Sequence, residues 1–139
     1  MPRRVLSIMG LLILITLMTG ILTAAAPLPV TTFTLVKGLP PTMNVGDTYT
    51  VTVKVASDQQ FISAQALPSF PFPGKGVAAV QGGDRSGSST SATLNVTFKA
   101  KGSTANFPSG VAPVFVVVGV RYAGGYVAVQ EYLFNVTVP

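Results

Sequence analysis

Cysteine, histidine and tryptophan are absent from the 139-residue chain, and only four of its residues are acidic. The missing cysteine and histidine exclude a zinc finger, a haem site of the usual kind, a thiol nucleophile and an imidazole base. Without a disulfide, the fold must be held by its hydrophobic core. Carboxylate chemistry has four candidates, which are Asp47, Asp58, Asp84 and Glu131. We therefore expect a non-catalytic protein that carries no cofactor and no metal ion.

The cationic side chains are few and scattered. Arg3 and Arg4 precede a long apolar run, and the seven others are spread between Lys37 and Arg121 without forming a cluster. Because nucleic-acid binding needs a basic patch or stripe, the sequence does not predict a nucleic acid as partner. The chain length indicates one domain, and the residues beyond the apolar run suffice for one sandwich-sized core.

The first 26 residues have the pattern of a secretory signal peptide. Met1–Arg4 is cationic, Val5–Ala26 carries no charge, and the run ends in small residues before Pro27. Proline restricts the residue before it, which makes a cut directly before Pro27 unfavourable. Cleavage is therefore expected between Ala25 and Ala26.

The alternative for this segment is an uncleaved signal anchor. Its 22 uncharged residues are enough to span a bilayer, which takes about 20. Under either interpretation residues 27–139 form the domain and lie outside the cytoplasm. Contact with the membrane is expected only through residues 5–26, and only if they are retained.

Alternating apolar and polar residues predict β-strands in the rest of the chain. In the clearest strand, 48–55, the side chains of Tyr49, Val51, Val53 and Val55 share one face, which is typical of a half-buried antiparallel strand. The same period predicts strands at 92–98 and 126–138, and weaker strands are expected at 32–36, 61–67 and 77–80.

Val114–Val120 differs from these strands because it is apolar on both faces. This predicts a strand in the middle of a sheet, with cover on each side. Gly124 and Gly125 indicate a tight hairpin turn after it. About seven short strands separated by turn clusters predict an all-β protein with the two-sheet, Greek-key architecture of an immunoglobulin-like sandwich, preceded by the N-terminal hydrophobic helix.

The segment Val45–Val53 resembles the start of the second strand in prokaryotic secreted immunoglobulin-like and fibronectin-like modules, including adhesion and cohesin-type sandwiches. The resemblance implies an extracellular structural or binding role and no common catalytic residues. Chagasin-like protease inhibitors share the size, export and fold. However, this chain reads Ala56–Gln60 where they carry a loop motif, and it lacks their Arg-Pro-aromatic triplet, which counts against inhibition.

A loop rich in proline and phenylalanine, Leu67–Gly74, is the candidate partner-binding site. Its three prolines forbid a regular strand or helix and favour a stiff, extended loop. The candidate residues are Phe70, Pro71, Phe72 and Pro73. Exposed phenylalanines would mark a partner site, whereas buried ones would extend the core.

The remaining polar candidates have ordinary structural explanations beside functional ones. Asp47 and Asp58 are expected to bond nearby backbone at turns. Asp84 lies in a Gly- and Ser-rich loop that could offer oxygen ligands to Ca²⁺. Calcium sites normally combine several carboxylate or carbonyl oxygens, so a single carboxylate favours a plain turn. Asn95 and Asn135 each begin an Asn-Val-Thr sequon and are candidate glycosylation sites.

The sequence favours an exported, non-catalytic module with a structural or adhesion-type binding role toward a protein or polysaccharide at the cell surface. One alternative is a membrane-anchored or pilin-like filament subunit that assembles through its N-terminal segment. Others are a secreted protease inhibitor and a carbohydrate-binding module that uses Tyr122, Tyr126 and Tyr132, although hairpin tyrosines more often pack across strands. Low charge and long apolar strands also leave edge-to-edge association of copies open.

Overall fold

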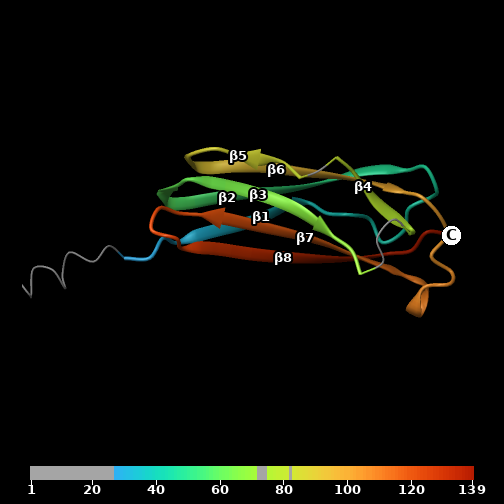
Figure 1. Ribbon diagram of the computed structural model, residues 1–139. Helices are drawn as coiled ribbons and strands as arrows, with labels where there is room; N and C mark the ends of the chain where they lie inside the picture. The colour runs from blue at the N-terminus through green and yellow to red at the C-terminus, as the bar shows by residue number, and fades with distance from the viewer. Residues whose placement is uncertain (1–26, 72–74, 82) are drawn as a thin grey trace, which may run out of the picture.

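The computed structural model describes residues 27–71, 75–81 and 83–139. The expected signal or anchor helix, with its cleavage residues Ala25 and Ala26, lies outside the described residues. The described part is all-β and consists of two antiparallel four-stranded sheets and one short 3₁₀ turn, Pro108–Gly110 (Figure 1). In these same residues no helix has the length and apolar character needed to cross a bilayer.

The two sheets contain every strand that the sequence predicts. The order in the first sheet is β1 (Thr31–Lys37), β2 (Thr48–Phe61), β6 (Ser89–Ala100) and β4 (Val77–Gln81). The order in the second sheet is β5 (Arg85–Ser86), β3 (Ser63–Ser69), β7 (Ala112–Arg121) and β8 (Val127–Val136). Only the two-residue strand β5 was not expected.

Strand β2 is longer than the alternation predicts. It continues to Phe61, which pairs with Ser89 after a register shift, so Ala56–Gln60 belongs to the strand and forms no loop. The chain then reaches β3 in the other sheet through Ile62 alone, whose N–H donates to the carbonyl of Arg121 at 2.8 Å.

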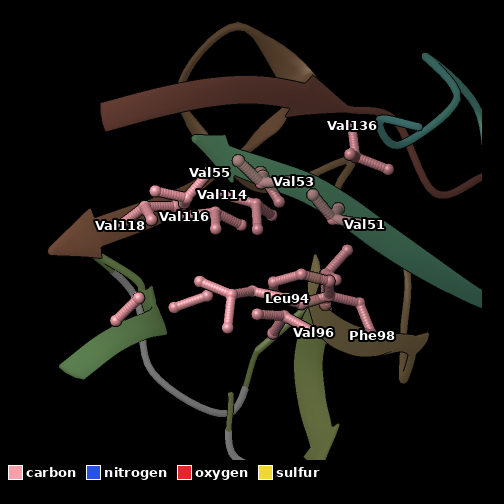
Figure 2. Close-up of a cluster of buried hydrophobic side chains, with 14 of the residues drawn as sticks. Val51, Val53, Val55, Leu94, Val96, Phe98, Val114, Val116, Val118 and Val136 are labelled. Atoms are coloured by element: carbon pink, nitrogen blue, oxygen red, sulfur yellow. The ribbon is translucent and has the colours of Figure 1, made fainter. Parts of the chain in front are cut away.

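The core lies between the sheets and is built from the inward-facing residue of each alternating pair. Figure 2 shows these side chains meeting from β2, β6, β7 and β8. The labelled ones are fully buried and consist of Val51, Val53, Val55, Leu94, Val96, Phe98, Val114, Val116, Val118 and Val136. Burying a valine or leucine side chain contributes about 1.5–3 kcal/mol, so this cluster supplies the stability that no disulfide provides.

The outer faces of the two sheets differ in chemistry. The first sheet presents threonine, asparagine and lysine. A hydrogen bond of 3.0 Å joins the hydroxyls of Thr50 and Thr97, and the Thr52 hydroxyl donates to the Asn95 side chain at 2.7 Å. The second sheet presents a group of apolar side chains beside polar ones such as Gln65 and Glu131; the apolar group consists of Leu67, Phe115, Val117, Val129 and Leu133.

The sequence predicts that both faces of β7 are covered, but in the described residues only its inner face is. The inner face packs against the first sheet, where Val114, Val116, Val118 and Val120 are fully buried. On the outer face Val117 is half-buried between its neighbours within the same sheet. The apolar character of this outer face therefore has no explanation in the core.

Candidate functional site

The C-terminus lies at one end of the sandwich (Figure 1), and the loops of this end line a cleft. The loop before β4 and the loop between β6 and β7 form its walls. It has a volume of about 550 Å³ and is lined by Lys75, Gly76, Lys101, Gly102, Ser103, Asn106, Phe107 and Pro108.

Gly76 fixes how closely the two loops approach. Its carbonyl accepts hydrogen bonds from the N–H groups of Lys101 at 2.6 Å and Gly102 at 3.3 Å. Its φ of +71° is in the left-handed region, which favours glycine. A side chain at this position would also press on Thr104 and on the Phe107 ring, at 3.1 and 3.2 Å. The glycine thus lets the aromatic ring lie directly beside the backbone.

Thr104 ties the second loop to the C-terminal strand region. It is fully buried, and its hydroxyl donates to the carbonyl of Gly110 at 2.7 Å and accepts from the N–H of Val138 at 3.0 Å. Its own N–H donates to the carbonyl of Val138 at 2.9 Å. Because its hydroxyl, N–H and carbonyl are all paired, the loop that carries Asn106 and Phe107 is held in one place.

The cleft is cationic. Lys75 and Lys101 approach it from different loops, both are exposed, and no carboxylate is among its lining residues in the described part of the chain. Asn106 and Ser103 add hydrogen-bonding groups, and Phe107 adds an aromatic surface. A concave site with one sign of charge concentrates ligands of the other sign.

The structure divides the predicted proline-phenylalanine site. The expectation that its prolines forbid a strand is wrong for Pro68, because β3 continues through Leu67–Ser69 and pairs there with β7. Phe70 is half-buried and packs edge-on against the Phe98 ring, with centroids 5.8 Å apart and planes at 80°, so it extends the core. Pro71 is exposed at the surface. Phe72 and Pro73 lie outside the described residues. The binding role of this loop stays a prediction.

The aspartates bond to backbone groups. Asp47 behaves as predicted, because its carboxylate accepts the N–H of Asn44 within the turn at 2.9 Å. The prediction for Asp58, a bond to nearby backbone at a turn, is wrong. Asp58 lies inside β2 and accepts the N–H of the distant Val30 at 2.8 Å. Among the residues described, no three His, Cys, Asp or Glu side chains are grouped to hold a metal ion.

Asp84 bridges the two sheets where the chain crosses from β4 to β5. Its N–H and its carboxylate bond the carbonyl and the N–H of Asn95 in the first sheet, at 3.1 and 2.8 Å. Its carbonyl accepts the N–H of Ala66 in the second sheet at 3.1 Å. The residue thus joins the sheets, which is more than the plain turn that the sequence favoured.

The other candidates are placed on the strands as expected or used in packing. Asn95 is half-buried on the outer face of β6, and Asn135 is exposed on β8. The Tyr122 hydroxyl bonds Ser57 at 2.7 Å and Thr31 at 2.6 Å, and its buried ring packs beside Tyr126. Tyr122 is therefore not available to stack on a sugar.

The cleft residues were not predicted as a site. The two Lys-Gly pairs at 75–76 and 101–102 are the signal that could have suggested them, since both stand in segments that read as turn clusters. Their 26-residue separation in the sequence hides the fact that one carbonyl, that of Gly76, joins them.

Comparison with known proteins assigns the chain to no family. No family model matches the chain, and no curated protein matches it. Fourteen chains of solved structures are similar. One of them comes from a structure described as "AvmM Catalyzes Macrocyclization in Alchivemycin A Biosynthesis"; it is 11% identical, with a TM-score of 0.45 over 78% of this chain and 88% of that chain.

Proposed function

We propose that the chain is an exported, non-catalytic β-sandwich module that acts at the cell surface or outside it and binds an acidic polysaccharide in its end cleft. The observation that carries this proposal is the pair of lysines on two facing loops, with hydrogen-bonding and aromatic residues beside them. No sequence relative contributes to it.

The architecture assigned to this module is the immunoglobulin-like Greek key. The strand orders support it, because β1-β2-β6-β4 facing β3-β7-β8 corresponds to the seven-strand arrangement of constant-type immunoglobulin domains. The crossing from β2 to β3 and the hairpin from β7 to β8 agree with that arrangement. In such sandwiches the binding residues are commonly on loops at one end.

The positions of the ends support a role in display. The described chain starts at Pro27, at the end of the sandwich opposite the cleft (Figure 1). The ten residues of β7 run between these ends, a length of about 33 Å. A module anchored by its N-terminal segment would hold the cleft away from the membrane, whereas a cleaved module would carry it into the medium.

The chemistry of the cleft favours an acidic sugar polymer over a neutral one. Lysines act as point charges toward carboxylates or sulfates, while Asn106 and Ser103 suit hydroxyl groups. Phe107 is half-buried in the same cleft and adds apolar surface to its wall.

The test compares binding to polygalacturonate with binding to uncharged dextran. The double variant Lys75→Ala/Lys101→Ala is expected to weaken binding to polygalacturonate at least tenfold, since two charge contacts are lost. Lys54→Ala is the matched control, because Lys54 is exposed on β2 outside the cleft. Equal binding of dextran, or an equal loss in the control, would show that the cleft does not act in this way.

Location is tested separately on protein from its native cells. Intact mass and N-terminal sequencing of the medium and membrane fractions decide between the two expectations. A chain that starts near Ala26 in the medium supports a released module. A chain that retains residues 5–26 in the membrane supports the anchored subunit, and a purely cytoplasmic chain refutes export.

A further inference from the structure

Strand β8 lies at an edge of the second sheet with one side open. β7 pairs along its other side from Val127 to Val136. In the described part of the chain, the backbone hydrogen bonds on the open side are those of Thr137, whose N–H and C=O bond Pro41 and Met43 at 2.8 and 3.0 Å, and Gly38 packs beside the Phe134 ring. Residues 127–135 therefore form a nine-residue edge that can accept a further strand.

The hydrogen bonds identify which backbone groups point toward this edge. The Tyr122 N–H donates to the carbonyl of Tyr126 at 2.9 Å, and in an antiparallel pair such bonded pairs recur at every second residue. Even-numbered residues of β8 thus bond β7, and odd-numbered residues point away from it. Thr137 obeys this alternation, because both of its bonds go to the opposite side.

The side chains on the open edge are mainly apolar. Val127, Val129 and Leu133 are 50%, 61% and 52% exposed, and Glu131 is the one charged residue between 127 and 135. Natural edge strands are usually protected by lysine, proline or a bulge. This segment contains neither residue, and its register with β7 is continuous.

We propose that the open edge binds the β8 strand of a second copy, in antiparallel orientation about a two-fold axis at Glu131. This joins the two second sheets into one eight-stranded sheet. Glu131 is the midpoint of 127–135, so this register gives every outward N–H and C=O of the edge a partner. A slip in either direction leaves some of them unpaired.

The sequence around Glu131 is self-complementary, and this favours a second copy over an unrelated strand. Val129 comes to lie opposite the partner's Leu133 on both sides of the axis, and apolar pairs of this kind stabilise antiparallel strands. The apolar outer face that includes Phe115 and Val117 then continues across both copies. The Gln130 side chain, which now donates to the Glu131 carbonyl at 3.0 Å, is displaced by the partner's N–H.

Glu131 restrains this association. In the proposed register it lies directly opposite the partner's Glu131, and like charges in that position destabilise the pair. One carboxylate at the centre of an otherwise apolar edge therefore keeps the dimer reversible. The inference does not depend on the ligand of the cleft.

Cross-linking tests the register, and the absence of native cysteine makes it clean. Single cysteines are placed in the full-length chain in neutral detergent and oxidised. Glu131→Cys is expected to link two copies, because opposite residues in a bonded pair have Cα atoms about 5.5 Å apart, a separation that suits a disulfide. Val129→Cys and Leu133→Cys alone are expected not to link, since each lies about 14 Å along the strand from its own counterpart.

The double variant Val129→Cys/Leu133→Cys is expected to link efficiently, because each cysteine then lies opposite one of the partner. Val45→Cys is the control: Val45 is exposed, so this variant measures linking by random collision within a micelle. Failure to link through position 131, or equal linking at all positions, overturns the proposal. Neutralising the restraint gives an independent readout, because Glu131→Gln should lower the dimer dissociation constant about two- to fivefold. The control is Lys54→Gln on the other sheet, whose dimer dissociation constant should stay within about twofold of that of the parent. An equal effect of Glu131→Gln and Lys54→Gln refutes the role of Glu131.

Discussion

Gly83 is the position where one added methyl group should do most damage. It lies where the chain crosses from β4 to β5, and its Cα passes so close to the second sheet that an added Cβ would overlap the carbonyl oxygen of Ala66. That oxygen belongs to the backbone of β3, so neither side can yield by rotating a side chain. In Gly83→Ala the crossing segment must therefore move away from β3.

The magnitude follows from what the crossing segment holds. Overpacking a tight site costs about 1–3 kcal/mol. Moving the segment also strains two hydrogen bonds of Asp84. The bond from the Ala66 N–H to the Asp84 carbonyl is neutral and contributes about 0.5–1.5 kcal/mol. The bond from the Asn95 N–H to the Asp84 carboxylate contributes about 1.5–3 kcal/mol. With these two bonds only partly lost, we expect Gly83→Ala to lower the free energy of unfolding by about 3–5 kcal/mol.

The assay is urea unfolding of the full-length chain in mild detergent, followed by far-ultraviolet circular dichroism. A loss of this size lowers the urea midpoint by about 2 M for a domain of this length. The control is Gly87→Ala, because Gly87 lies just past β5, in the turn before β6, and has nothing within 4 Å of an added Cβ. That variant should be neutral or slightly more stable. If both glycine variants unfold at the same urea concentration, the close approach to β3 is wrong.

Two further substitutions probe the ends of the sandwich with the same assay. Tyr122→Phe should lower the free energy of unfolding by about 1–2 kcal/mol, because it removes the buried hydroxyl that bonds Ser57 and Thr31. Tyr126→Phe is the control and should leave the stability unchanged. Equal effects of the two variants would refute the role of the Tyr122 hydroxyl. Thr104→Val should lower the free energy of unfolding by about 2–3 kcal/mol, because the carbonyl of Gly110 and the N–H of Val138 lose their partner. The variant should also weaken polygalacturonate binding. Unchanged stability in Thr104→Val would show that the loop is held by other contacts.

The strands were predictable because their signal is local. Val51, Val53 and Val55 alternate with polar residues, and the same alternation marks β6 and β8, so burial of one face was readable from neighbours two residues apart. Gly124 and Gly125 marked the hairpin for an equally local reason, since both take a positive φ of 87° and 91°.

The extension of β2 through Ala56–Gln60 was not predictable in this way. The segment is polar, and its bonds go to residues far away in the sequence. The side chain of Asp58 binds Val30, that of Gln59 binds the carbonyl of Pro27, and that of Gln60 binds Ser88. Partners about 30 residues apart leave no periodic trace, which is why this segment reads as a loop.

The cleft and the sheet crossing were missed for the same physical reason. Asp84 acquires its role only when Ala66 and Asn95 lie on either side of it, and Lys75 becomes part of a site only through its approach to Lys101. The sequence shows each residue in a turn-rich segment but not the neighbour that gives it a function. Turn chemistry thus located the loops, while tertiary pairing decided what they form.

Charge gives the two proposals opposite responses to salt. Residues 27–139 carry seven cationic and four acidic side chains, and six of the seven cations are exposed, so each copy has a net positive charge. Two positive copies repel each other, so screening by added salt should strengthen pairing through β8. The same screening should weaken the attraction of the cleft for an acidic polysaccharide. Raising the salt from about 0.05 to 0.5 M should therefore increase cross-linking through Glu131→Cys while it decreases polygalacturonate binding. A parallel change in both would mean that one surface serves both interactions, which the separation of β8 residues 127–135 from the cleft residues does not allow.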